Sequence, residues 1–480
     1  MIVTDLYPLV FWAIQQAPLT VLQQSPCLSF YGSSPSGKTH FFGTSEKPCI
    51  ANTGRLFPDH PPLYIDEHDL NSAQLVWLEH DASALDASIT SGKDTQFGHV
   101  LDTILELQSE SDSTHNGQEV MRDSVPFARV LHADERSALV RMEQGSAQAV
   151  DLRLPPFWKS VLLPQHPMPL VPVPSKAIKR VQRLLDGIKY DAEIGHLVNT
   201  LSTGQMKKDI EFLTGEDPNS PIVSRHSFSE GVRIAANWIK ERVEETGATC
   251  ELKPFLTGFG PNVICSYPST AVTNETVLLS AHYDSRGSFG SLRAPGGDDD
   301  GSGTIAILAI ARAIAKNGIK FKRNVQLCTF AGEEQGLIGS RAYAGELREA
   351  GADLTLMVQA DMLAYHKAGE PPQLGLPDVI GTTEVTQLVA NLSAIYSPEL
   401  KVGFTPACCS DHQASSFHQQ GFPATQVFER AGPIADPMYH NSGDLSNREG
   451  YDFNQVKSIA KVQFATLLHA AGFETSQGAS

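Results

Sequence analysis

The sequence lacks any run of apolar residues long enough to cross a membrane as a helix. Such a helix needs roughly 20 apolar residues in succession, and no run in this 480-residue chain approaches that length. Basic residues are also scarce: 37 Lys and Arg stand against 54 Asp and Glu, for a formal charge of −17. Because phosphate binding requires a basic surface, we expect neither a membrane span nor a nucleic-acid partner.

Paired cysteine motifs are absent as well. None of the seven cysteines belongs to a C-x-x-C pair, which argues against a cysteine-ligated zinc site. The number is odd, so at least one thiol is free or pairs between chains. Cys250 and Cys265 lie in two strand-like runs, TCELKPF and NVICSY, and could be bridged. Cys328 lies in an apolar strand, where we expect an inert core residue.

The N-terminus gives mixed indications about secretion. The run LYPLVFWAI resembles the apolar part of a signal peptide, but Pro8 interrupts it and no basic residue precedes Lys38. Two N-x-[ST] sequons, at Asn274 and Asn391, would matter only in a secreted protein. We favour a secreted protein.

The character of the chain changes near residue 175. Residues 1–175 mix short alternating apolar runs with polar loops, which is typical of a small β-leaning domain, and they carry no catalytic motif. Seven prolines between Pro155 and Pro174 exclude a helix there and favour a stiff, extended connector. We therefore predict an N-terminal accessory or pro-domain over 1–175 and a second domain over 176–480.

Residues 176–480 alternate between amphipathic helices and apolar strands. Helices are predicted over 177–188, 203–215, 227–247, 304–318 and 336–351, and strands over 275–284, 324–330 and 353–362. Ser227 and Glu230 have the spacing of a capping box at the start of the third helix. This alternation predicts an α/β sheet covered on both faces, in which sites gather at the carboxyl ends of the strands.

Five short motifs carry residue types that bind metals. They contain His282 in SAHYDS, Asp299 in GGDDDGSG, Glu334 in AGEEQG, Asp361 in QADML and His440 in MYHNSGD. Two imidazoles and three carboxylates can hold two divalent metals, and a set without thiolates is typical of catalytic zinc. With two Zn²⁺ and one bridging hydroxide, the three carboxylates would give a neutral inner shell. Each motif alone has a plain alternative, such as a solvated acidic turn for the aspartate triplet, so the inference rests on the set.

The motifs, together with the stretch from Ser410 to Phe417, resemble those of the zinc aminopeptidases of the bacterial leucyl aminopeptidase type. Relatives of that family include glutamate carboxypeptidase and glutaminyl cyclase. The resemblance covers residues from about 185 to 475. It implies a three-layer α/β/α peptidase domain with a mixed, mostly parallel central sheet, holding two Zn²⁺.

The resemblance also implies a role for each ligand. Asp299 would bridge the two ions, His282 and Asp361 would complete the first position, and Glu334 and His440 the second.

Further residues receive roles in the same way. Glu333 matches the general acid/base that takes a proton from the bridging water, and Asp284 matches the carboxylate behind the first histidine. The family also has a cis peptide after the bridging acid, here between Asp299 and Asp300.

The residue that would donate a hydrogen bond to the oxyanion differs from the one used by some family members. Some members use a tyrosine on the loop before SDH, flanked by a disulfide, but Ala407 stands there and only Cys409 of the pair aligns. Cys408 and Cys409 could form a vicinal disulfide or stay reduced. Other members use a tyrosine immediately before the last histidine, which is Tyr439 here. We expect Tyr439 to donate to the oxyanion, with a packing tyrosine as the alternative.

The implied function is removal of N-terminal, apolar residues from peptides by a monomeric aminopeptidase. Met362, Phe428 and Tyr439 match positions that line an apolar pocket for the first residue. A dizinc carboxypeptidase or dipeptidase is the main alternative, since Arg286 and Arg430 lie near the motifs and could bind a carboxylate. A glutaminyl cyclase or a non-catalytic binding module is less favoured, because the five-residue set is complete.

Overall fold

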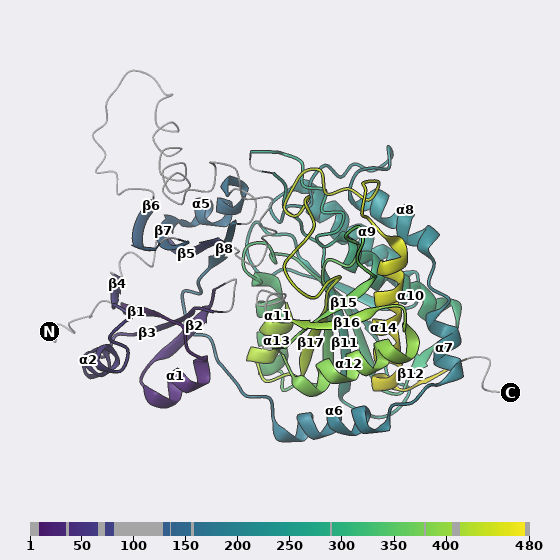
Figure 1. Ribbon diagram of the computed structural model, residues 1–480, viewed down its shortest axis with the longest axis horizontal. Coiled ribbons are helices and arrows are strands. Elements are labelled where there is room, and N and C mark those ends of the chain that lie inside the picture. Colours follow the sequence, from purple (N-terminus) through teal and green to yellow (C-terminus); the bar gives the residue numbers. More distant parts are fainter. Residues whose placement is uncertain are drawn as a thin grey trace, which may run out of the picture. The chain divides into compact units, whose positions relative to one another are not determined.

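The computed structural model describes residues 9–34, 38–65, 73–80, 128–134, 136–154, 158–288, 290–378, 381–405 and 413–475. The described chain forms two compact units, one ending at Leu170 and one beginning at Val171 (Figure 1). Residues 163–174, at this junction, contain no helix or strand until α6 begins at Ser175.

Two four-stranded antiparallel sheets form the N-terminal unit. The first has the order β2-β3-β1-β4 and consists of β1 (Leu9–Ile14), β2 (Ser29–Ser33), β3 (His40–Thr44) and β4 (Leu63–Ile65), with helices α1 (Pro18–Gln24) and α2 (Lys47–Leu56). The second has the order β6-β7-β5-β8 and consists of β5 (Ala73–His80), β6 (Ala128–Ala133), β7 (Ser137–Glu143) and β8 (Trp158–Leu162), with α5 (Gln144–Gln148) and the 3₁₀ helix η3 (Val150–Arg153). The two sheets repeat one topology, and the predicted β-rich character is confirmed.

Residues 9–14 of the apolar run near the N-terminus belong to the first of these sheets. Leu9–Ile14 form β1, which pairs with both β3 and β4. Val10, Trp12 and Ile14 are fully buried. The apolar composition that resembles a signal peptide therefore supplies a core strand of this unit.

A six-stranded mixed sheet forms the centre of the C-terminal unit. Four strands run parallel to one another, namely β17 (Ala424–Val427), β14 (Asp353–Ala360), β11 (Glu275–His282) and β13 (Asn324–Phe330). Two antiparallel strands, β10 (Asn262–Tyr267) and β9 (Thr249–Lys253), extend the sheet beyond β13. The predicted mixed, mostly parallel sheet is confirmed.

Helices cover both faces of this sheet (Figure 1). One core contains residues of α6 (Ser175–Gly187), α7 (Ala192–Val198), α8 (Thr203–Leu213), α9 (Glu230–Glu244), α10 (Gly301–Lys316), α12 (Thr383–Tyr396) and α14 (Phe453–Ala471). The opposite core contains residues of α11 (Ile338–Glu349) and α13 (Gln413–Gln419). Val277 and Leu279 of β11 lie in the first core and Leu278 in the second, as the alternation of side chains along a strand requires. The unit therefore has the predicted three layers.

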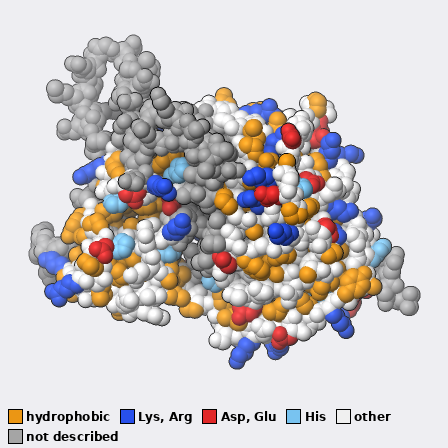
Figure 2. Space-filling model, in the orientation of Figure 1, with side chains coloured by type: hydrophobic (Ala, Val, Ile, Leu, Met, Phe, Trp, Pro, Cys, Tyr) orange, Lys and Arg blue, Asp and Glu red, His pale blue; other side chains and the backbone are white. Residues whose placement is uncertain are grey.

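Four short strands complete the unit. They are β15 (Gln373–Pro377) paired with β16 (Lys401–Thr405), and β12 (Lys320–Phe321) paired with β18 (Phe473–Glu474). The charged side chains on the face drawn in Figure 2 are of both signs and are scattered. No helix among the described residues is long and apolar enough to cross a membrane.

The predicted start of α9 is wrong. The helix begins at Glu230, and its N-cap is Ser229, whose side chain accepts a hydrogen bond from the Val232 N–H. Ser227 does not cap the helix because its hydroxyl donates to the Asp284 carboxylate, 57 residues further along the chain. A tertiary partner has replaced the local one that the capping box predicts.

Of the two disulfides among the described residues, one was suggested by the sequence and the other was not. Cys250 and Cys265 are joined across β9 and β10, and a second disulfide joins Cys27 to Cys49 in the N-terminal unit. Cys328 is free and fully buried, and burial raises the pKa of its thiol. Such a thiol is unreactive, as expected for a core residue.

The oxyanion loop considered above lies outside the described residues. This applies to Ala407, Cys408 and Cys409, and to Ser410 of the SDH motif.

Candidate active site

The residues of all five metal-binding motifs meet at the carboxyl ends of the parallel strands. His282 ends β11, Asp361 directly follows β14, and Glu334 lies in the turn after β13. Asp299 lies in the turn just before α10, and His440 lies in the loop that leads to α14. Carboxyl ends of neighbouring parallel strands share one edge of a sheet, which is where α/β proteins place their sites.

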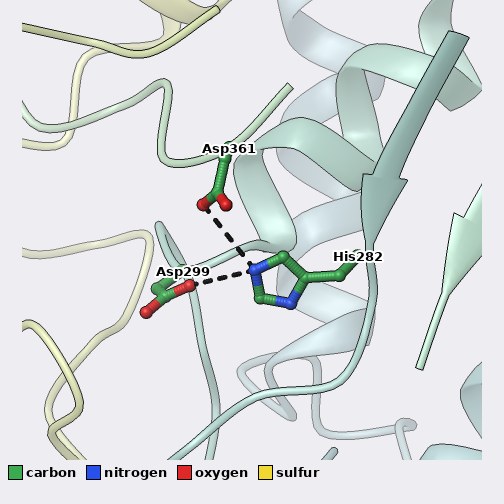
Figure 3. A group of neighbouring side chains, drawn as sticks. All are labelled: His282, Asp299 and Asp361. Atoms are coloured by element: carbon green, nitrogen blue, oxygen red, sulfur yellow. Dashed lines mark ion pairs between the residues drawn. The ribbon is translucent and has the colours of Figure 1, made fainter. Parts of the chain in front are cut away.

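One group of three side chains forms around His282. Its Nε2 lies 3.2 Å from Asp299 Oδ1 and 3.6 Å from Asp361 Oδ1, and both carboxylates point toward this nitrogen (Figure 3). Their potential ligand atoms lie within 4.8 Å of one another, close enough for a single ion to reach all three.

A second group forms around His440. Its Nε2 lies 2.9 Å from Glu334 Oε2 and 3.3 Å from Asp299 Oδ2. Asp299 therefore directs one oxygen to each histidine, which is the arrangement that a carboxylate bridging two ions requires. This is the grouping that the family resemblance implies.

The donor set fits divalent cations. Among the described residues, His282 Nε2 and Glu334 Oε1 are buried and have no hydrogen-bond partner. Buried polar atoms are costly to leave unpaired, and a cation would satisfy both. Imidazole nitrogens and carboxylate oxygens without thiolates suit a catalytic zinc site.

The charges of the site depend on one another. Burial opposes the charged form of His282, but the carboxylates of Glu333 and Asp361 raise the pKa of this imidazole well above its usual value. Burial also opposes ionisation of Asp299, yet its ion pairs with His282 and His440 lower the pKa of its carboxyl group below the ordinary value. Burial raises the pKa of Glu334.

Each member of the aspartate triplet has a different task. Asp299 faces the histidines, whereas Asp298 accepts hydrogen bonds from the N–H groups of Ala364 and Tyr365, just after β14. Asp300 caps α10 and accepts from the backbone N–H groups of His282 and Met362. The two outer acids therefore hold in place the backbone segments that carry His282 and Asp361.

The backbone around the triplet depends on glycine. Gly296 has a φ of +55°, and a Cβ there would lie 2.4 Å from the Asp299 carbonyl oxygen. The Asp299–Asp300 peptide is cis, as the family resemblance implies.

Strained residues cluster at the site. Among the described residues, the non-glycine residues with positive φ are Leu337, Met362 and His440. His440 is itself a candidate ligand, and Met362 follows Asp361. Uncommon backbone conformations of this kind gather at functional sites, where the surrounding structure holds them.

Asp284 and Ser227 support the first histidine. The backbone carbonyl of Asp284 lies 3.2 Å from His282 Nδ1 and its Oδ1 lies 3.4 Å away. Oδ2 of Asp284 accepts from the Ser227 hydroxyl at 2.7 Å and from the Glu334 N–H at 3.4 Å. The Ser227 hydroxyl in turn accepts from the Gly332 N–H at 3.0 Å. This network ties His282 to the turn that carries Glu333 and Glu334.

Glu333 lies at the more open side of the cluster. Its Oε2 is 3.9 Å from His282 Nε2, and its side chain is 12% exposed, compared with 1% for His282 and 2% for Asp361. It is therefore close to the candidate metal positions and still reached by water.

The ring of Tyr439 stacks on the ring of His440, with centroids 3.8 Å apart and an interplanar angle of 21°. Tyr439, Met362 and Phe428 are all buried. Tyr439 thus lies beside the second group, as an oxyanion donor or a packing residue would.

The two arginines considered for carboxylate binding have other partners. Arg430 donates from Nε and Nη2 to Glu370, both at 2.9 Å. Arg286 is buried, and its Nη1 lies 3.0 Å from His440 Nδ1. Neither contact favours a role in binding a substrate carboxylate.

Ser227, Asp300 and Arg286 are the site residues whose roles the sequence did not reveal. Ser227 and Arg286 act on partners 57 and 154 positions away, so no local spacing marks them. Asp300 is visible in the triplet, but only the fold separates its role from that of Asp299.

Comparisons with known proteins agree with this geometry. Residues 262–466 match the model of peptidase family M28. Leucine aminopeptidase 1 of Sclerotinia sclerotiorum is 32% identical over 280 residues, covering 53% of this chain and 68% of that protein. Leucine aminopeptidase 1 of Grosmannia clavigera is 31% identical over 309 residues, covering 60% and 72%.

Solved structures show the same fold. The LapA aminopeptidase of Legionella pneumophila aligns with a TM-score of 0.58 at 15% identity, covering 83% of this chain and 98% of its own. LapB from the same organism aligns with a TM-score of 0.57 at 15% identity, covering 83% and 100%.

The network around Ser227 predicts a difference between two neighbouring serines. Ser227→Ala removes a partner from Asp284 and from the Gly332 N–H, so zinc affinity should fall about 10- to 100-fold, as for other residues that orient a ligand. Ser229→Ala removes only the N-cap of α9 and should cost about 1 kcal/mol of stability with unchanged zinc affinity. Zinc titration and urea unfolding of both variants measure the two effects. Equal zinc affinities in the two variants would remove the proposed role of Ser227.

Proposed function

The chain belongs to peptidase family M28 and is a peptide hydrolase, a metallo-aminopeptidase like its relatives; from this premise we propose that it removes apolar N-terminal residues with two zinc ions. The observation that supports this most is the position of Asp299 between the two histidines, with one oxygen toward each. His282 and Asp361 would hold one ion, and Glu334 and His440 the other.

When bound, two zinc ions would activate a water molecule and polarise the scissile carbonyl. Glu333 is the proposed general base that takes the proton of this water, since it is partly exposed and its Oε2 lies 3.9 Å from His282 Nε2. The same carboxyl group would return the proton to the leaving amine. Asp284, Ser227 and Asp300 keep the ligands in place, so that the reacting atoms meet in one geometry.

Tyr439 is the proposed hydrogen-bond donor to the oxyanion. Its ring stacks on His440, which brings it to the edge of the second metal position. The hydroxyl group would stabilise the charge that develops on the carbonyl oxygen.

A free α-amine rather than a carboxylate is the proposed recognition element of the substrate. The Arg430 side chain is engaged by Glu370, and the Arg286 guanidinium contacts the Nδ1 of His440, the ring nitrogen that does not face the carboxylates. The buried surroundings of the cluster carry several carboxylates, which attract a cationic amine. The apolar side chains of Met362, Phe428 and Tyr439 are the proposed pocket for the first residue.

We also propose that the protein is secreted. The described chain contains two disulfides, and such bonds persist in oxidising compartments. We also propose that residues 1–175 are an accessory or pro-domain and that the enzyme acts as a monomer.

The proposed function predicts cleavage of leucine anilide but not of its N-acetyl form. Activity should disappear with a chelator and return with zinc. Glu333→Gln keeps the size of the side chain but cannot accept the proton, so kcat should fall roughly 10²- to 10⁴-fold while zinc remains bound. Equal cleavage of the acetylated substrate, or full activity of the variant, would contradict the proposal.

Tyr439→Phe separates the two roles of the tyrosine. The ring can still stack on His440, so folding should be unchanged, and loss of the hydroxyl should lower kcat by about 10²- to 10³-fold with little change in KM. Comparison of kcat and KM with the wild type provides the measurement. A kcat within a few-fold of the wild type would assign Tyr439 to packing alone.

A further inference from the structure

The Nδ1 atoms of the two histidines, which point away from the candidate metal positions, face groups of opposite hydrogen-bonding type. His282 Nδ1 faces acceptors, the backbone carbonyl and the carboxylate of Asp284. His440 Nδ1 lies 3.0 Å from Arg286 Nη1. A guanidinium carries only donors, so this contact makes Nδ1 of His440 the acceptor. A metal-ligating histidine normally donates from its other nitrogen, and only His282 has the surroundings for that.

The contact with Arg286 limits which nitrogen of His440 can carry the proton in a neutral ring. In a neutral ring whose Nδ1 accepts a hydrogen bond, the proton lies on Nε2. Nε2 is the nitrogen directed to Glu334 and Asp299, at 2.9 and 3.3 Å. An ion that binds there must replace this proton, and the ring then either gives up the hydrogen bond from Arg286 or carries a negative charge. His282 can bind an ion while its Nδ1–H still donates to Asp284.

The charge of Arg286 acts in the same direction. Its side chain is buried, with 3% exposure, so water screens the guanidinium poorly. An arginine remains charged at all ordinary pH values. It therefore offsets part of the carboxylate charge of Asp299 and Glu334 before a cation arrives and repels a cation beside His440. It also draws electron density from the ring, opposite to the effect of a carboxylate behind a ligand.

We propose that Arg286 is a positioning residue that acts through His440 and makes the Glu334–His440 position the weaker of the two metal positions. This inference rests on the proposed two-metal function. The position of His282 and Asp361, beside Asp284, would hold its ion tightly. The position of Glu334 and His440, beside Arg286, would exchange its ion.

Stepwise zinc titration of the full chain tests this directly. The protein is freed of metal and titrated with Zn²⁺ against a chromophoric chelator, which yields two dissociation constants. Arg286→Gln removes the charge and can present an amide oxygen to a His440 Nδ1–H. The weaker step should then tighten by about tenfold or more, the size of effect known for groups behind a metal ligand, with the tighter step unchanged.

Two further variants provide the controls. Arg286→Lys retains a cation and a donor and should keep the wild-type constants. Arg293→Gln removes the same charge from an exposed position of the same loop and should change neither step. An unchanged or weakened second step in Arg286→Gln, or equal changes in both steps, would overturn the inference while leaving the two-metal function intact. A wild-type chain that binds no zinc would overturn both.

A measurement on the wild type covers the case in which the glutamine variant fails to fold. Anomalous diffraction at the zinc absorption edge, on crystals of the wild-type chain with one equivalent of zinc, reports which position fills first. The inference requires the peak among His282, Asp299 and Asp361. A peak among Asp299, Glu334 and His440 instead would overturn the inference regardless of any variant.

Discussion

The burial of carboxylates at the carboxyl edge of the parallel strands is the constraint on which the rest of the C-terminal unit depends. Asp299, Glu334 and Asp361 are all less than 10% exposed, and charges so placed are costly without compensation. Their side chains converge on two imidazoles, and the surrounding backbone adopts conformations that most residues avoid. The sheet, the glycine-flanked triplet and the outer acids together maintain an arrangement that a divalent cation would stabilise.

The position of the site follows from the order of strands and helices. His282, Glu334 and Asp361 each lie at or just after the end of a strand of the parallel set, so strand alternation in the sequence was enough to predict a common edge. The layers could be predicted for the same reason, because the short apolar strands β11, β13 and β14 are separated by the helices α10 and α11. The sequence alone could not predict which atoms meet, since a triplet of aspartates gives no indication of which one faces inward. The resemblance to a family supplied that detail, and the fold shows the separate partners of Asp298 and Asp300.

Contacts between distant segments were beyond sequence reasoning. Ser227 has the spacing of a helix cap, yet a buried carboxylate 57 positions away is a stronger partner than the helix end. Arg286 was considered as a carboxylate binder because it lies near a motif, whereas the fold directs it to His440. The repeated topology of the two N-terminal sheets was also missed, since the strands of the two halves share order and direction rather than residues. In each case the deciding interaction is tertiary.

The central claim is that Asp299 bridges two ions between His282 and His440. Anomalous diffraction at the zinc absorption edge, on crystals of the zinc-loaded full chain, tests it most directly. The account predicts two peaks, one among His282, Asp299 and Asp361 and one among Asp299, Glu334 and His440. A single peak, or no peak at either position in zinc-saturated protein, would contradict it.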